Sequence, residues 1–289
     1  MKGRQLGGLT LARAVEMVMP FARKAFFPET EPEEWAPYEG WLKPKAMDPS
    51  GALLFTVQSY LVRTSHHTIL IDSCVGNNKE RANRPLWHQK TDDTYLQALG
   101  ALGLAPEDID YVMCTHLHSD HVGWNTRLEG GRWVPTFPNA RYVFTKKELE
   151  AWEQGHPKFT RHPLEDSVLP VIAAGKAELV TNDYALDDEV WLEPSPGHTP
   201  DHVSIRLASQ GQNAVMCGDL MHSPVQCLHP EWTVWPDWNA AKAKQTRRAF
   251  LERHAGTDML VCTAHFPLPS AGRIVAQRDG FRFEAEADW

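Results

Sequence analysis

The chain has 289 residues, of which 42% are hydrophobic and 23% are charged, a balance typical of a globular protein with a sizeable core. Its formal net charge of -8 argues against a nucleic-acid partner, because phosphate binding depends on clustered lysine and arginine. No stretch approaches the roughly 20 apolar residues that cross a bilayer, and the N-terminus lacks the apolar core of a signal peptide. The five cysteines show no paired spacing, so we expect a cytoplasmic protein with buried free thiols and no membrane partner.

The first fifty residues are rich in proline, glutamate and tryptophan after one apolar stretch. That stretch, Leu9–Phe26, is interpreted as a helix. We expect residues 1–50 to form an arm or lid and residues 51–289 to form a single domain. The mixed sequence around Trp35 and Trp41 fits either a lid or the contact surface of a homodimer.

The rest of the chain alternates between strand and helix signals. Strands are expected at residues 53–64, 67–73, 109–116, 139–145, 189–197, 202–209, 213–220, 259–265 and 280–286. Helices are expected at residues 92–103, 146–154 and 237–254, the last with a solvated charged face. Thr145 and Glu148 form a capping box before the second of these helices. Strands followed by helix–strand alternation in two halves predict an α/β sandwich with helices on its outer faces.

A dense group of potential metal ligands follows the strand at residues 109–116. His116 and His118 are two residues apart at its end, so an extended backbone directs both side chains to the same side. Asp120 and His121 follow in a turn that can return the chain to that point. Four nitrogen and oxygen ligands within six residues predict a preorganised cation site.

Three later residues have the same placement, each at the end of a strand and before a turn. They are His198 in PSPGHTPDH, Asp219 in VMCGDL and His265 in VCTAHF. Strand ends at one edge of a sheet are where α/β proteins build their sites. The seven side chains suffice for two metal ions with positions left open for water. Because no cysteine is among them, the set indicates a catalytic site rather than a closed structural one.

This HxHxDH motif and the later ligands resemble the metallo-β-lactamase superfamily from about Leu53 to His265. The resemblance implies an αββα sandwich, with two mixed sheets and helices on the outer faces, whose catalytic domain is residues 51–289. It also implies one metal ion held by His116, His118 and His198, a second held by Asp120, His121 and His265, and Asp219 bridging them. Asp72 matches the family's aspartate behind the site, which fixes the tautomer of a ligand histidine. We expect zinc, with manganese, iron and cobalt as alternatives.

The stretches FPNARYVF, GHTP and GDLMHSPVQ are similar to one branch of this superfamily. That branch contains acyl-homoserine lactonases, methyl parathion hydrolase and the hydrolytic chlorothalonil dehalogenase. Homoserine lactonases usually place a tyrosine three positions after the bridging aspartate, where this chain has His222. We leave two roles open for His222: a hydrogen bond to substrate, or packing.

The resemblance implies a hydrolase acting on a small, apolar ester or lactone, with organophosphates as a side activity. A hydroxide bridging the two ions attacks the substrate, and Asp120 carries a proton to the leaving group. Three tryptophans in loops that flank the site are expected to line the substrate pocket: Trp124, Trp232 and Trp235. The alternative for each is packing under the loops. Six other histidines are interpreted as ordinary turn or surface residues: His88, His156, His162, His202, His229 and His254.

Two other functions remain open from the sequence. One is hydrolytic dehalogenation of an activated chloroaromatic ring by the same hydroxide. The other is a non-catalytic metal-binding protein that keeps the fold.

Overall fold

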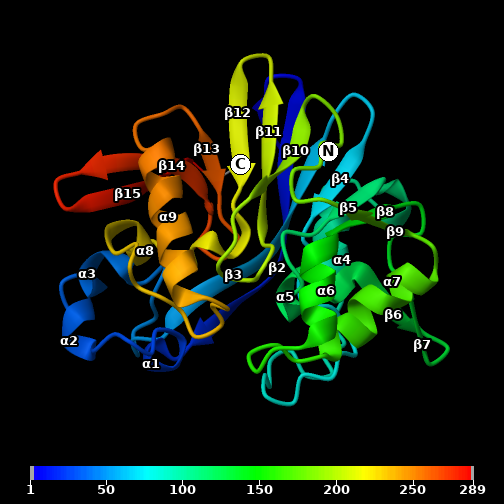
Figure 1. Ribbon diagram of the computed structural model, residues 1–289, viewed down its shortest axis with the longest axis horizontal. Coiled ribbons are helices and arrows are strands. Elements are labelled where there is room, and N and C mark those ends of the chain that lie inside the picture. Colours follow the sequence, from blue (N-terminus) through cyan, green and yellow to red (C-terminus); the bar gives the residue numbers. More distant parts are fainter. Residues whose placement is uncertain (1–2, 288–289) are drawn as a thin grey trace. The chain divides into compact units, whose positions relative to one another are not determined.

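The computed structural model describes residues 3–287, which form two compact units (Figure 1). Unit 1 contains the residues up to Met17 together with Val57–Tyr184. Unit 2 contains Val18–Thr56 and the residues from Ala185 onward. The boundary falls inside the expected N-terminal arm, so the arm contributes to both units.

Unit 1 is built on a mixed sheet. Its strands are β1 (Arg4–Leu6), β2 (Leu9–Phe21), β3 (Leu53–Arg63), β4 (Thr68–Ile71), β5 (Tyr111–Met113), β8 (Arg141–Thr145) and β9 (Ala177–Val180), with β6 (Thr126–Glu129) and β7 (Arg132–Pro135) as a separate hairpin. The strand order is β1-β2-β3-β4-β5-β8-β9, and β2 and β3 continue across the unit boundary. The predicted β3–β4 hairpin is confirmed as antiparallel, whereas β4, β5, β8 and β9 pair in parallel.

The helix expected over Leu9–Phe26 is wrong for most of its length, because residues 9–21 form β2. Beyond Ala12, buried residues such as Ala14 and Glu16 alternate with more exposed ones. This period of two belongs to a strand. Ladder hydrogen bonds, beginning with the β1 pairing, outweigh the helix propensity of the alanine, methionine and glutamate residues in the stretch.

The helices of unit 1 follow the parallel strands. They are α4 (Thr94–Ala101), η1 (Pro106–Asp108), α5 (Ser119–Val122), η2 (Gly123–Asn125), α6 (Lys146–Gln154), the π-helix η3 (Leu164–Val168) and α7 (Leu169–Ala173). The expected helices at α4 and α6 are confirmed. The Thr145 hydroxyl accepts a hydrogen bond from the backbone N–H of Glu148 at 3.4 Å, as the capping signal predicts.

Unit 2 contains a second mixed sheet. Its strands are β10 (Val190–Pro194), β11 (Val203–Ser209), β12 (Gln212–Met216), β13 (Leu260–Cys262), β14 (Ala271–Gln277) and β15 (Gly280–Ala285), in that order. Only the β12–β13 pairing is parallel among these described strands. The helices are α1 (Arg23–Phe26), α2 (Pro32–Trp35), α3 (Glu39–Leu42), η4 (Gly218–Leu220), α8 (Val225–Leu228) and α9 (Ala240–His254). The long helix α9 packs beside β14 (Figure 1).

The face of α9 that was expected to be solvated is partly buried. Arg247 is 1% exposed. Its guanidinium donates to the backbone carbonyls of Leu220, Pro230 and Trp232 at 2.8 Å. Five directed donors let arginine satisfy several loop carbonyls at once, which is why this charged side chain is held inside.

The expectation of an α/β fold with two mixed sheets and helices is confirmed. Within the described residues, no helix is both long enough and apolar enough to cross a membrane. All five cysteines are buried and free, as expected.

Candidate metal centre

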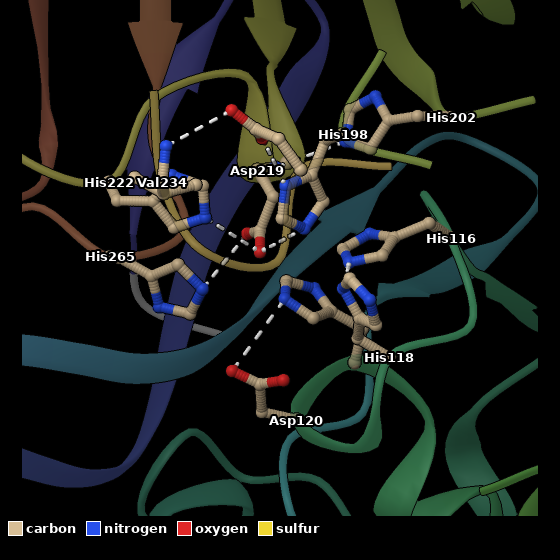
Figure 2. A network of polar contacts seen from close by, with 12 residues as sticks. His116, His118, Asp120, His198, His202, Asp219, His222, Val234 and His265 are labelled. Carbon is tan, nitrogen blue, oxygen red and sulfur yellow. Dashed lines mark hydrogen bonds and ion pairs between the residues drawn. The ribbon is translucent and has the colours of Figure 1, made fainter. Parts of the chain in front are cut away.

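The HxHxDH motif of unit 1 lies where β5 ends and α5 begins. His116 and His121 are each 1% exposed, and their rings are 4.1 Å apart between centroids. His116 Nε2 lies 3.0 Å from His118 Nδ1 (Figure 2). Asp120 is in the first turn of α5, and its carboxylate lies 3.9 Å from His121 Nε2. A short strand, a five-residue loop and a helical turn therefore bring the four motif residues into one cluster.

Asp72 fixes this cluster from behind. It directly follows β4 with a positive φ of 56°. Its carboxylate accepts from the Thr115 backbone N–H, the Thr115 hydroxyl and His121 Nδ1, each at 2.8 Å. Because the Thr115 hydroxyl gives its proton to Asp72, His116 Nδ1 at 3.0 Å donates to that hydroxyl. Both His116 and His121 thus carry a proton on Nδ1 and present Nε2.

In unit 2, a second cluster is centred on Asp219, in the 3-10 turn η4 after β12. His198 Nε2 and His222 Nε2 both lie 3.1 Å from Asp219 Oδ2, and His265 Nε2 lies 2.9 Å from Oδ1 (Figure 2). All four side chains are buried. The Asp219, His222 and His265 ligand atoms lie within 4.8 Å of one another, a spacing that a metal ion could bridge.

A further residue of this cluster, Asp237, was not expected from the sequence. Its Oδ1 accepts from His198 Nδ1 at 2.9 Å, and the Val234 backbone N–H donates to Oδ2 at 3.2 Å. Asp237 is fully buried, and Arg247 lies 3.7 Å away. Asp237 therefore does for His198 what Asp72 does for His121. Asp237 was expected to begin a helix over residues 237–254, but it precedes α9, which starts at Ala240, and no spacing connects it to the ligands.

His202 was interpreted as a surface histidine, and this is wrong, because it is fully buried. Its Nε2 accepts the backbone N–H of Asp219 at 3.1 Å, so the ring proton is on Nδ1, which donates to Ser195 Oγ at 2.9 Å. Ser195 in turn bonds Ser204 at 2.9 Å. His202 thus holds the backbone of Asp219. His254 is also buried rather than on the surface.

Two histidines that face the same carboxylate have opposite proton affinities. Burial lowers the pKa of His198, but Asp219 and Asp237 on its two nitrogens outweigh burial and raise that pKa to about 9. Burial lowers the pKa of His222 to about 4, with only Asp219 opposing. The pKa of Asp237 is raised by burial but lowered overall by His198 and Arg247.

The donor set of each cluster fits a divalent cation. His265 Nδ1 lies 2.9 Å from the Thr56 backbone carbonyl, which only accepts, so His265 carries its proton there. A neutral His265 then presents its Nε2 lone pair to the Asp219 carboxylate, which is also an acceptor. Such converging lone pairs require a positive charge between them, either a proton or a metal ion. Imidazole and carboxylate together suit zinc and its first-row neighbours.

The three tryptophans expected near the substrate have different surroundings. Trp124 is buried in unit 1, where its indole N–H donates to Glu16 at 2.7 Å and its ring stacks on Tyr95. Trp232 is buried in unit 2 and stacks on His229. Trp235 is 47% exposed. Only Trp235 therefore offers a large part of its ring to solvent.

Comparison with known proteins matches residues 53–265 to the metallo-beta-lactamase superfamily. The chain belongs to this superfamily. An N-acyl homoserine lactonase from Bacillus sp is 26% identical over 180 residues, which are 59% of this chain and 65% of that protein. The matched region therefore spans just under two thirds of that relative.

Two solved structures share the fold. AidC, a dizinc quorum-quenching lactonase in complex with a product, gives a TM-score of 0.79 at 23% identity, covering 99% of this chain and 97% of that one. The hydrolase AbOPH gives 0.81 at 22% identity, covering 98% and 96%. At these identities the likeness concerns the fold.

Proposed function

We propose that this superfamily member is a dinuclear metal-dependent hydrolase of small, apolar lactones or esters. His116, His118 and His198 would hold one ion, Asp120, His121 and His265 would hold the other, and Asp219 would serve both. Family membership, the likeness to a dizinc lactonase and the clustered histidine and aspartate side chains support a metal-dependent hydrolase.

One observation carries the proposal: four of the histidines have their Nδ1 committed to the protein. The partners of Nδ1 are Thr115 Oγ1 for His116, Asp72 for His121, Asp237 for His198 and the Thr56 carbonyl for His265. Each Nε2 is thereby left to bind a metal. Outer partners of this kind orient ligand histidines and raise their basicity. A set of solvated histidines would have no reason to share this arrangement.

Two bound divalent ions supply Lewis acidity, which lowers the pKa of water and polarises the substrate's scissile bond. The chain's own residues then have distinct tasks. Asp219 places a negative charge among the ligand histidines of unit 2. Asp120 is less buried than His121 beside it, and its carboxylate would accept the proton that the attacking water loses and pass it to the leaving oxygen.

His222 supports Asp219 in this proposal. The Asp219 carboxylate accepts, so His222 Nε2 carries the proton of the neutral ring. Its pKa of about 4 keeps the ring neutral at physiological pH. The ring contacts Phe26 and Phe55 edge-on or tilted, at centroid distances of 5.2 and 6.3 Å. His222 therefore orients the carboxylate and packs, and it is not a substitute for the tyrosine of homoserine lactonases.

The substrate class rests on chemistry and on relatives. The phenyl rings beside His222 give the unit 2 cluster an apolar border, which suits a hydrophobic acyl group. The Bacillus relative is an N-acyl homoserine lactonase, and we extend lactone hydrolysis to this chain. Hydrolysis of organophosphate triesters is the proposed side activity.

The test is turnover by zinc-loaded protein of a panel: an acyl-homoserine lactone, an alkyl δ-lactone, a chromogenic ester, a phosphotriester and an activated aryl chloride. The proposal expects ring opening or ester cleavage that disappears on chelation and returns with zinc. Halide release as the main reaction would favour a dehalogenase. No turnover of any substrate by protein holding two ions would favour a metal-binding protein.

A further inference from the structure

A buried carboxylate that belongs to neither ligand cluster contacts the two segments of unit 1 that flank the HxHxDH motif. Glu16 lies in β2 and is 4% exposed. It accepts from the Val75 backbone N–H at 2.7 Å and from the Trp124 indole N–H at 2.7 Å, and Lys90 Nζ is 2.9 Å away. An isolated carboxylate at such a site would be costly, and these three donors offset the cost.

The two segments that Glu16 contacts flank the metal motif. Val75 is three residues after Asp72, and Trp124 is three residues after His121. Between them, three backbone hydrogen bonds of 2.7 to 2.8 Å run from Ser73 to His121, from Gly123 to Cys74 and from Trp124 to Ser73. The loop of Asp72 and the end of the motif are therefore tied together, and Glu16 is bonded to both.

The backbones of the Asp72 loop and of the end of the motif lie so close together that neither can shift towards the other without a clash. A Cβ built on Gly123 would lie 1.8 Å from the Val75 carbonyl oxygen, so no larger residue fits there. Cys74 has a positive φ of 53°, a conformation that a non-glycine residue keeps only when its surroundings impose it. The Val75 N–H bonded to Glu16 directly follows this strained residue, so Glu16 is part of what imposes the conformation.

We infer that Glu16 is a positioning residue for the metal motif: through Val75 and Trp124 it fixes the Asp72 loop against His121. Asp72 receives the Nδ1 proton of His121 at 2.8 Å, so the direction of His121 Nε2 depends on where this loop sits. Lys90 is itself held in place beside Glu16, because its ammonium also bonds Asn77 at 2.8 Å and Asp92 at 3.1 Å. Burial raises the pKa of Glu16, and Lys90 opposes that rise.

The inference rests on the proposed dinuclear site, and its test is metal binding rather than turnover. Glu16→Gln keeps the size of the side chain and removes its charge. We expect the dissociation constant of the weaker-bound zinc ion to rise about 10-fold, the lower end for outer partners of metal ligands, with the tighter ion affected less. Competition with a chromogenic chelator measures both constants.

Asp110→Asn is the matched control. Asp110 is a unit 1 carboxylate that accepts the Thr68 backbone N–H at 2.7 Å, and it precedes β5, whereas the motif follows β5. We expect this variant to keep both dissociation constants. Trp124→Phe is the milder second variant, because it deletes one donor to Glu16 and keeps a ring beside Tyr95. A roughly 3-fold weakening is expected, consistent with loss of one hydrogen bond.

A double-mutant cycle separates positioning from general stability. If Glu16 acts through Asp72, the effects of Glu16→Gln and Asp72→Asn on zinc affinity will not add. Additive effects, or zinc affinities of Glu16→Gln and Trp124→Phe equal to those of Asp110→Asn, would overturn the inference. Fewer than two ions bound by the unaltered protein would instead overturn the proposed function.

Discussion

Asp237 Oδ1 lies 2.9 Å from His198 Nδ1, and both side chains are buried in unit 2. Asp72 has the same relationship to His121 in unit 1, at 2.8 Å. Each cluster thus has one histidine oriented by an aspartate that binds no metal in the proposed function. Two carboxylate–histidine pairs from distant parts of the chain serve the same purpose.

Replacing Asp237 with asparagine should weaken metal binding. The variant keeps an oxygen for His198 Nδ1 but loses the charge that raises the basicity of the ring. We expect zinc affinity to fall about 10- to 100-fold, measured by chelator competition. Asp258→Asn, at an exposed aspartate of unit 2, is the control and should bind zinc normally. Unchanged affinity in Asp237→Asn would contradict the role given to this pair.

Zinc binding to the metal-free protein should release protons. The pKa of His198 is raised to about 9, so this ring is charged below that pH and must lose a proton before it binds a metal. Calorimetric titration at pH 7.5 in two buffers of different ionisation enthalpy counts the protons released. We expect at least one per chain, and an apparent affinity that increases with pH up to about 9. Binding without proton release would show that His198 is not a ligand.

The same shift predicts how the metal-free fold responds to pH. A raised histidine pKa means that the folded chain binds more protons than the unfolded one between about 6.5 and 9. The stabilisation is therefore complete below pH 6.5 and is lost as pH rises to about 9. Thermal unfolding of the chelated protein should show Tm falling across this window, and the decline should be smaller in Asp237→Asn.

Removing the ring nitrogens of His202 should affect both stability and the metal centre. His202→Phe leaves the Asp219 N–H and the Ser195 hydroxyl without their imidazole partner in a buried site. We expect the free energy of unfolding to fall by about 1–3 kcal/mol per group left unsatisfied. Urea denaturation measures this loss. His202→Gln, which retains an acceptor, should lose less, and equal losses in the two variants would argue against the hydrogen bond to Asp219.

His254 should make the fold acid-sensitive in a separate pH range. Burial, followed by the charge of Arg206, lowers its pKa to about 4. The folded chain binds fewer protons there than the unfolded chain between about 4 and 6.5, so stability falls as pH drops through this range. Tm measured from pH 4 to pH 7 should decline less in His254→Gln. His66→Gln, at an exposed histidine, should follow the unaltered protein.

The residues proposed as metal ligands could be selected from the sequence because their signals are local. His116 and His118 owe their common direction to a spacing of two residues after a strand, and Asp219 and His265 each follow a short apolar strand. Of the two aspartates that orient ligand histidines, Asp72 was expected from the family resemblance, whereas Asp237 was not. Asp237 reaches His198 across 39 positions, and no periodicity or motif encodes that contact.

The sequence-based predictions that proved wrong elsewhere failed because tertiary contacts decided the outcome. Residues 9–21 have helix-favouring side chains, yet hydrogen-bonding neighbours make them a strand. Arg247 and His202 belong to residue types that are usually exposed. Both are buried because backbone groups of nearby loops need their nitrogen atoms, and that need is visible only in the folded chain.

We propose that the chain binds a pair of metal ions through its clustered histidine and aspartate side chains. Elemental analysis of zinc-loaded protein after gel filtration, for the unaltered chain and for Asp219→Ala, tests it most directly. We expect two ions per chain in the unaltered protein, and at most one in the variant together with loss of lactone hydrolysis. One ion or none in the unaltered protein, or an active Asp219→Ala variant with two ions, would contradict it.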